Sequence, residues 1–88
     1  MEITAAEKLS KTLQWEVHGP AGLTRYFTCE VPEGRMEIHR SETSYKKNPP
    51  YLARFFSSSG GSKLLGSSTY VESAKYKHAI HLAKLRAT

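Results

Sequence analysis

The chain has 88 residues, which allows one folded domain with a small core. Hydrophobic residues make up 39% of the sequence and charged residues 24%, which is typical of a folded domain rather than of a disordered tail. A single cysteine, Cys29, excludes an internal disulfide and a zinc site built from several thiolates. No apolar run approaches the ~20 residues that cross a bilayer, and Glu2 and Glu7 argue against a signal peptide. We therefore expect a reduced, cytoplasmic or otherwise intracellular protein with no membrane partner.

Positive charge is concentrated in the second half of the chain. The formal net charge is +5. Residues 1–42 contain five lysines and arginines against seven glutamates, whereas residues 43–88 contain eight against one. A basic excess confined to one half is typical of proteins that bind polyanions, although extra lysine also maintains solubility.

The first half predicts a short N-terminal element followed by strands. Residues 1–11 contain good helix formers but few apolar anchors, so they form either a short helix or a loose arm. From Leu13 onward apolar and polar residues alternate with a period of two, which predicts antiparallel strands joined by Gly- and Pro-containing turns. The expected strands are residues 13–18, 23–31 and 35–41, followed by a polar loop at 42–50.

The second half predicts two more strands and a helix. Residues 51–57 form the clearest strand, and a short strand at 63–65 stops at Gly66. Thr69 and Glu72 have the spacing of a capping box, which predicts a helix over 69–86. Its apolar stripe, which can pack on a sheet, consists of Val71, Ala74, His78, Leu82 and Leu85.

These elements predict the fold class and the domain organisation. We expect an α+β fold, in which an antiparallel sheet of four to five strands within residues 13–66 carries one C-terminal helix on a face. The whole chain, residues 1–88, forms a single domain.

Catalytic and metal-binding motifs are weak in this sequence. Cys29 lies among apolar neighbours, where a thiol is usually a core residue, and no Gly-x-Ser-x-Gly pattern is present. The run 60–63, Gly-Gly-Ser-Lys, resembles a phosphate loop but lacks the Walker spacing and leads into a strand. His78 and His81 have ligand-compatible spacing, but nothing in the sequence demands further ligands. We expect no enzyme, no metal site and no cofactor.

The strand at 51–57 presents two alternating sets of side chains. We expect Ala53 and Phe55 to face the helix, because an unpaired Arg54 buried there would be strongly unfavourable. Arg54 and Phe56 would then face outward, in a surface that can bind nucleic acid. The predicted nucleic-acid-binding residues are Arg54, Phe56, Lys46, Lys47 and Lys63. A competing basic surface on the helix consists of Lys75, Lys77, Lys84 and Arg86.

Residues 51–86 also carry a resemblance to a known class of domain. The segments that carry it are 51–56, Tyr-Leu-Ala-Arg-Phe-Phe; the turn 60–63; 65–69, Leu-Gly-Ser-Ser-Thr; and 72–74, Glu-Ser-Ala. This order resembles the three-stranded-sheet-plus-helix DNA-binding domains of the plant ethylene-response-factor type and the arm-binding domains of phage tyrosine integrases. The resemblance implies that the sheet enters the major groove, that the helix supports it from behind, and that Arg54 contacts DNA. The plant family has Arg- and Trp-rich strand faces, whereas the matching positions here are Arg54, Phe56, Ser62 and Leu64.

Two functions follow from these features. The first hypothesis is a small non-enzymatic nucleic-acid-binding module, with DNA favoured over RNA. The alternative is a protein-binding regulator or inhibitor of the kind that phages and mobile elements encode, which would engage an acidic partner. Tyrosines, which are enriched in interface hot spots, favour this alternative: Tyr45, Tyr51, Tyr70 and Tyr76. The oligomeric state is left open.

Overall fold

The computed structural model describes residues 2–19, 25–40 and 50–87, which form two helices and five strands. The elements in chain order are α1 (Glu2–Thr12), β1 (Glu16–His18), β2 (Tyr26–Val31), β3 (Gly34–Arg40), β4 (Tyr51–Ser57), β5 (Ser62–Ser68) and α2 (Val71–Ala87). The expected α+β class, with an antiparallel sheet and a C-terminal helix packed on it, is confirmed. Two of the predicted binding residues, Lys46 and Lys47, lie outside the described residues.

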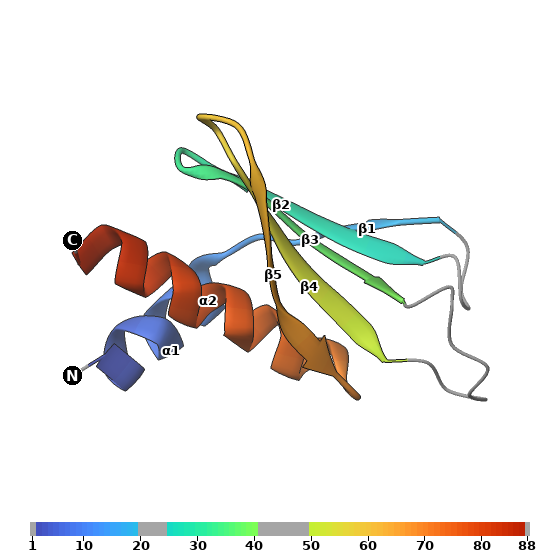
Figure 1. Ribbon diagram of the computed structural model, residues 1–88. Coiled ribbons are helices and arrows are strands. Elements are labelled where there is room, and N and C mark those ends of the chain that lie inside the picture. Colours follow the sequence, from blue (N-terminus) through green and yellow to red (C-terminus); the bar gives the residue numbers. More distant parts are fainter. Residues whose placement is uncertain (1, 20–24, 41–49, 88) are drawn as a thin grey trace.

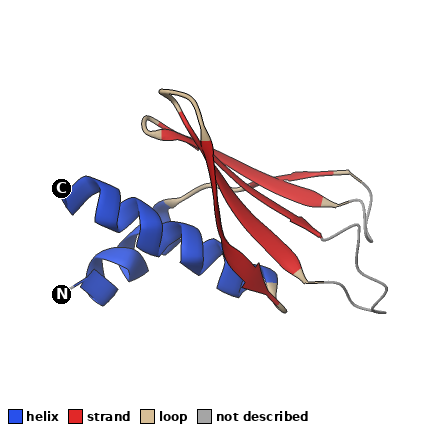
Figure 2. Cartoon of the chain, in the orientation of Figure 1, coloured by secondary structure: helices blue, strands red, loops and turns tan. Residues whose placement is uncertain are grey.

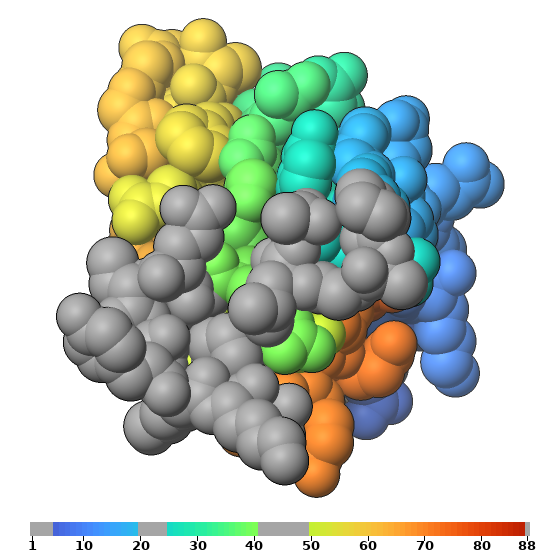
Figure 3. All heavy atoms as spheres, turned by 90° about the vertical axis from the view of Figure 1, so that its right-hand side faces the viewer, coloured from blue at the N-terminus to red at the C-terminus, as the bar shows by residue number. Residues whose placement is uncertain are grey.

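Each strand of the sheet pairs with its neighbour in the chain. The strand order is β1-β2-β3-β4-β5 and every pairing is antiparallel (Figure 1). Figure 3, seen from the side, shows the strands next to one another in chain order, from blue at the N-terminus to yellow and orange. Both helices lie on one side of the sheet (Figure 2), where α2 contacts β3, β4 and β5 and α1 packs against α2. On the other side of the sheet, the described residues form no helix.

The core lies between the sheet and α2. Paired residues of adjacent strands point to the same face, so the register brings Phe27, Ile38 and Ala53 together. A second cluster contains Cys29, Met36 and Phe55 from the sheet and Leu82 from the helix. The prediction that Ala53 and Phe55 face inward is confirmed, since both are almost fully buried.

Two element boundaries near the N-terminus differ from the expected ones. The N-terminal residues form a helix of three turns rather than a loose arm, and Ala6 is buried in it. The backbone amide of Leu13 bonds to the carbonyl of Leu9, so the helical hydrogen-bond pattern extends past Thr12. The predicted strand at 13–18 is therefore shortened to three residues and begins at Glu16.

A β-bulge changes the last strand. β5 does not stop at Gly66 but continues to Ser68. The register with β4 shifts between Ala53, which pairs with Gly66, and Arg54, which pairs with Leu64, so that Leu65 is the extra residue. The bulge lets the strand run on past the glycine.

The helix α2 begins later than predicted, and most of its predicted apolar stripe is buried. Its first backbone bond runs from the amide of Ala74 to the carbonyl of Tyr70, so the helix begins at Val71 and the predicted start at Thr69 is wrong. Within the predicted stripe Ala74, His78 and Leu82 are buried, as is Ala79, which the stripe did not include. Leu85 is 40% exposed, because this last turn lines the mouth of a surface hollow rather than the core.

Candidate functional site

The helix-free face of the sheet has mixed charge. The register aligns its side chains in three rows that run across the strands. Two rows run from β1 to β5: the first consists of His18, Tyr26, His39, Leu52 and Ser67, and the second of Glu16, Thr28, Glu37, Arg54 and Leu64. The third row runs from β2 to β5 and consists of Glu30, Arg35, Phe56 and Ser62. Arg54 and Phe56 therefore point outward, as the sequence predicts. Among the described strand residues of this face, three glutamates outnumber the two arginines, and Arg35 is paired with Glu30 at 3.1 Å. These residues therefore give the face no excess of positive charge.

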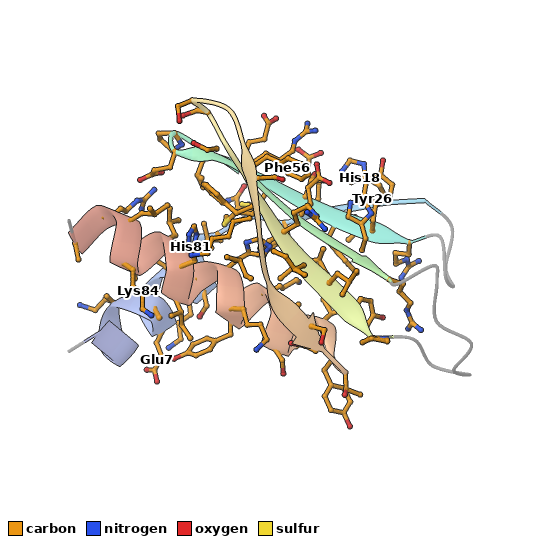
Figure 4. The ribbon with its side chains drawn as sticks, viewed as in Figure 1. Glu7, His18, Tyr26, Phe56, His81 and Lys84 are labelled. Carbon is orange, nitrogen blue, oxygen red and sulfur yellow. The ribbon has the colours of Figure 1, made fainter. Side chains whose placement is uncertain are left out.

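Three rings on this face stack on one another rather than remaining open. The centroid of Tyr26 lies 4.7 Å from that of His18 and 5.0 Å from that of His39, and the ring planes are nearly parallel. Figure 4 shows His18 next to Tyr26 on the sheet. His18 is also within hydrogen-bond distance of Thr28, at 2.8 Å, and His39 of the carboxylate of Glu37, at 2.7 Å. Both faces of the Tyr26 ring are thus covered, so it offers no surface on which a nucleobase could stack.

Lys63 lies on the opposite side of the sheet from Arg54, which corrects the predicted grouping. It pairs with Phe55, whose side chain is buried under the helices, whereas Arg54 pairs with Leu64. Without the bulge at Leu65 the register would place Lys63 beside Phe56 on the helix-free face. The extra residue moves it to the helix side. Of the predicted surface, the described residues bring together only Arg54 and Phe56.

Lys63 instead joins two lysines of α2 around a shallow groove. This groove lies between β5 and α2 and has a volume of about 260 Å³. Lys77 and Lys84 are seven residues apart, which is two helical turns, so they lie on the same side of α2. The aliphatic part of Lys77 passes over Gly66, 3.5 Å from where a β-carbon would lie. We call this surface the lysine groove; it is lined by Lys63, Leu64, Leu65, Lys77, Ile80, His81 and Lys84.

The two remaining helix cations of the predicted alternative surface have acidic partners. Arg86 forms a bidentate ion pair with Glu33. Its Nε donates a hydrogen bond to Oε2 at 2.7 Å, and its Nη2 donates one to Oε1 at 3.2 Å. This contact raises the pKa of Arg86 and lowers that of Glu33. Lys75 lies 4.0 Å from Glu72 and over the ring of Phe27, with 5.5 Å between ammonium and ring centroid. The helix cations therefore divide into a paired set and the two that face the groove.

A larger hollow adjoins the lysine groove at the turn between β4 and β5. It has a volume of about 550 Å³ and shares Lys63 and His81 with the groove. The rings of His81 and Phe55 meet edge-on with centroids 4.9 Å apart. Burial lowers the pKa of His81, and the nearby ammonium groups of Lys63 and Lys84 lower it further, so this imidazole is neutral at pH 7. We call this hollow the turn pocket; its lining also includes Glu33, Ser57, Ser58, Gly60, Gly61, Ser62 and Leu85.

Sequence reasoning missed both hollows, although one signal was present. The spacing of Lys77, His81 and Lys84 puts them on one side of a helix, but which side faces β5 depends on how α2 packs. The apolar floor of the groove comes from Leu65, the bulged residue, and from Ile80. Neither position carries a pattern that would mark a site.

The thiol of Cys29 and the imidazole of His78 are buried in the core. Burial raises the pKa of Cys29, which keeps its thiol protonated. His78 points at the carbonyl of Glu37 in β3, whereas His81 lies against Phe55 in β4, so the two imidazoles are directed to different strands. Among the residues that the structure describes, no group of three or more His, Cys, Asp or Glu side chains is arranged to hold a metal ion. Neither described helix is long and apolar enough to cross a membrane.

Comparison with known proteins gives no relative for this chain. No family model, no curated protein and no solved structure matches it. The two hollows and the charges around them are therefore the features from which a function can be inferred.

Proposed function

We propose that this protein is a small non-enzymatic nucleic-acid-binding module that holds the phosphate backbone in the lysine groove. The observation that carries this proposal is the convergence of Lys63, Lys77 and Lys84, from two elements, around one concave surface. None of the three has an ion-pair partner within 4.0 Å among the described residues, so their charges are available to a ligand.

The chemistry of the groove suits phosphates better than base edges. Lysine ammonium groups act as point charges on flexible stems, which neutralise phosphates without reading sequence. Leu65 and Ile80 provide an apolar floor between the lysines, against which sugars can pack. This arrangement does not by itself distinguish DNA from RNA. It does shift the proposed contact surface from the sheet face around Arg54 to the edge between β5 and α2.

Salt-dependent binding tests the proposal. Fluorescence anisotropy of a labelled oligonucleotide is measured at several salt concentrations between about 50 and 200 mM. Lys84→Gln is compared with Arg54→Gln, a matched control that removes one positive charge from the helix-free face. We expect Lys84→Gln to weaken binding and to reduce the slope of log K against log salt by about 0.7–0.9, and Arg54→Gln to leave the slope unchanged.

Two results would contradict the proposal. A larger effect of Arg54→Gln than of Lys84→Gln would place the contact on the helix-free face. The absence of binding at the lowest salt concentration, where a net charge of +5 favours association most, would exclude nucleic acid as the ligand.

A protein-binding regulator is the second candidate, and one observation favours it. β5 is an edge strand, and its Leu64 side chain is 49% exposed beside the lysine groove. An extended segment of an acidic partner could add to this edge through backbone hydrogen bonds. Binding that survives high salt and is lost in Leu64→Lys would support this function over the first.

A further inference from the structure

We propose that the ligand of the lysine groove is a single-stranded nucleic acid and that one of its nucleobases enters the turn pocket. This inference rests on the proposed function, and it adds the strandedness of the ligand and the position of one base.

The two hollows lie next to each other along the molecule. Lys63 and His81 line both, so a strand whose phosphates follow Lys77 and then Lys84 along α2 reaches the turn pocket at His81 and Lys63. Figure 4 shows His81 and Lys84 on the same helix, with His81 nearer the sheet. Of the three lysines only Lys63 lines the turn pocket, whereas Lys77 and Lys84 line the groove alone. A phosphate would remain in the groove while the attached base turns inward.

The lining of the turn pocket suits a nucleobase. The neutral ring of His81, held against the buried Phe55, supplies aromatic surface, and Leu85 supplies an aliphatic wall. Hydroxyl groups of the β4–β5 turn, among them Ser57, can exchange hydrogen bonds with the polar edge of a base. The volume of about 550 Å³ falls within the range of small-molecule sites, about 300–1,000 Å³.

A duplex fits this arrangement poorly. The faces of its bases are covered by stacking and their edges are paired, so a base enters a pocket only after being flipped out of the helix. A single strand has bases that are already free to turn and to stack on aromatic side chains. The Tyr26 ring on the helix-free face offers no comparable stacking surface, because the rings of His18 and His39 stack on it.

The experiment compares a single strand with a duplex of the same length, label and salt concentration. We expect the single strand to bind about tenfold more tightly, the gain from stacking one base. His81→Ala should reduce this ratio toward one, whereas Lys84→Gln should weaken both ligands by a similar factor. A fluorescent base analogue in the single strand gives a readout that needs no variant, because stacking against His81 changes its emission.

The outcomes separate the inference from the proposed function. Equal affinity for the two ligands, with both weakened by Lys84→Gln, overturns the inference and leaves phosphate binding in the groove intact. An unchanged emission of the analogue at every position of a bound single strand also overturns it. Binding of neither ligand overturns both proposals. A thermal melt shows whether the His81→Ala variant is folded. If it is not folded, the emission of the base analogue bound to the unmodified protein tests the inference instead.

Discussion

The imidazole of His78 donates a hydrogen bond from Nε2 to the backbone carbonyl oxygen of Glu37, at 2.9 Å, and so joins the middle of α2 to β3. Because a carbonyl oxygen only accepts, Nε2 of this imidazole carries a proton. Its Nδ1 is buried with no hydrogen-bond partner among the described residues. Protonation would place a positive charge on a nitrogen that nothing solvates.

This environment makes stability depend on pH. Burial, the largest effect, and the nearby His81 lower the pKa of His78 from the usual 6.5 to about 4, although the bond to Glu37 opposes the shift. A histidine with a lowered folded-state pKa contributes its full stability above about pH 6.5 and loses it as the pH falls toward 4. We expect a loss of about 3 kcal/mol over this window, measured by urea unfolding. His78→Gln, which keeps an amide donor but does not titrate, should show a much flatter profile; an equally steep one would contradict the assignment.

Gly34, at the start of β3, has no room for a side chain. Its φ is +154°, and an added β-carbon would collide with the backbone carbonyl of Phe56. We expect Gly34→Ala to lower the free energy of unfolding by about 2–4 kcal/mol, because backbone rather than a flexible side chain must move. The control is Gly60→Ala, where φ is +101° but the space is open, so only the backbone strain of about 1 kcal/mol should appear. Equal losses in the two variants would rule out the collision as the cause.

The thiol of Cys29 should react only when the protein opens. Its side chain is buried in the second core cluster, and burial raises its pKa, so little thiolate is present and little of it is accessible. We expect a colorimetric disulfide reagent to modify native protein slowly and unfolded protein at once. A fast, stoichiometric reaction in the absence of denaturant would show that the strand is not covered as described.

The pairing of Arg86 with Glu33 should contribute modestly to stability. It ties the last turn of α2 to the β2–β3 turn through two hydrogen bonds, but both side chains remain partly exposed to solvent. A double-mutant cycle with Arg86→Gln and Glu33→Gln should give a coupling energy of about 0.5–1 kcal/mol that decreases with salt. A coupling energy near zero would mean that solvent screens the pair completely. Because Arg86 is already paired, Arg86→Gln should also affect nucleic-acid binding less than Lys84→Gln.

The strand β4 shows how much the sequence could predict. Its bounds, Tyr51–Ser57, match the expected ones, and the choice of Ala53 and Phe55 as the inward set followed from the high cost of burying Arg54. A local pattern and one strong energetic preference sufficed there. The length of α1 and its packing on α2 could not be predicted in the same way, because few apolar side chains mark the contact.

The candidate site was less predictable because it depends on a register. In a strand every side chain changes face when the pairing slips by one residue, and the bulge at Leu65 produces such a slip. The sequence around Gly66 permits a bulge but does not require one. The side on which Lys63 lies, and with it the composition of the lysine groove, is therefore decided by tertiary packing against α2.

The order of strand pairing has a consequence for how the chain folds. Every strand joins a partner that is adjacent in sequence, so the sheet can assemble from successive hairpins with short loop closures, a topology of low contact order. The helix α1 is the exception, because its packing partner is the last element, α2. During synthesis on a ribosome, α1 emerges before the five strands, and α2, which packs against it, emerges only after them. We expect the docking of these two helices to be the latest step of folding, after the hairpins have formed.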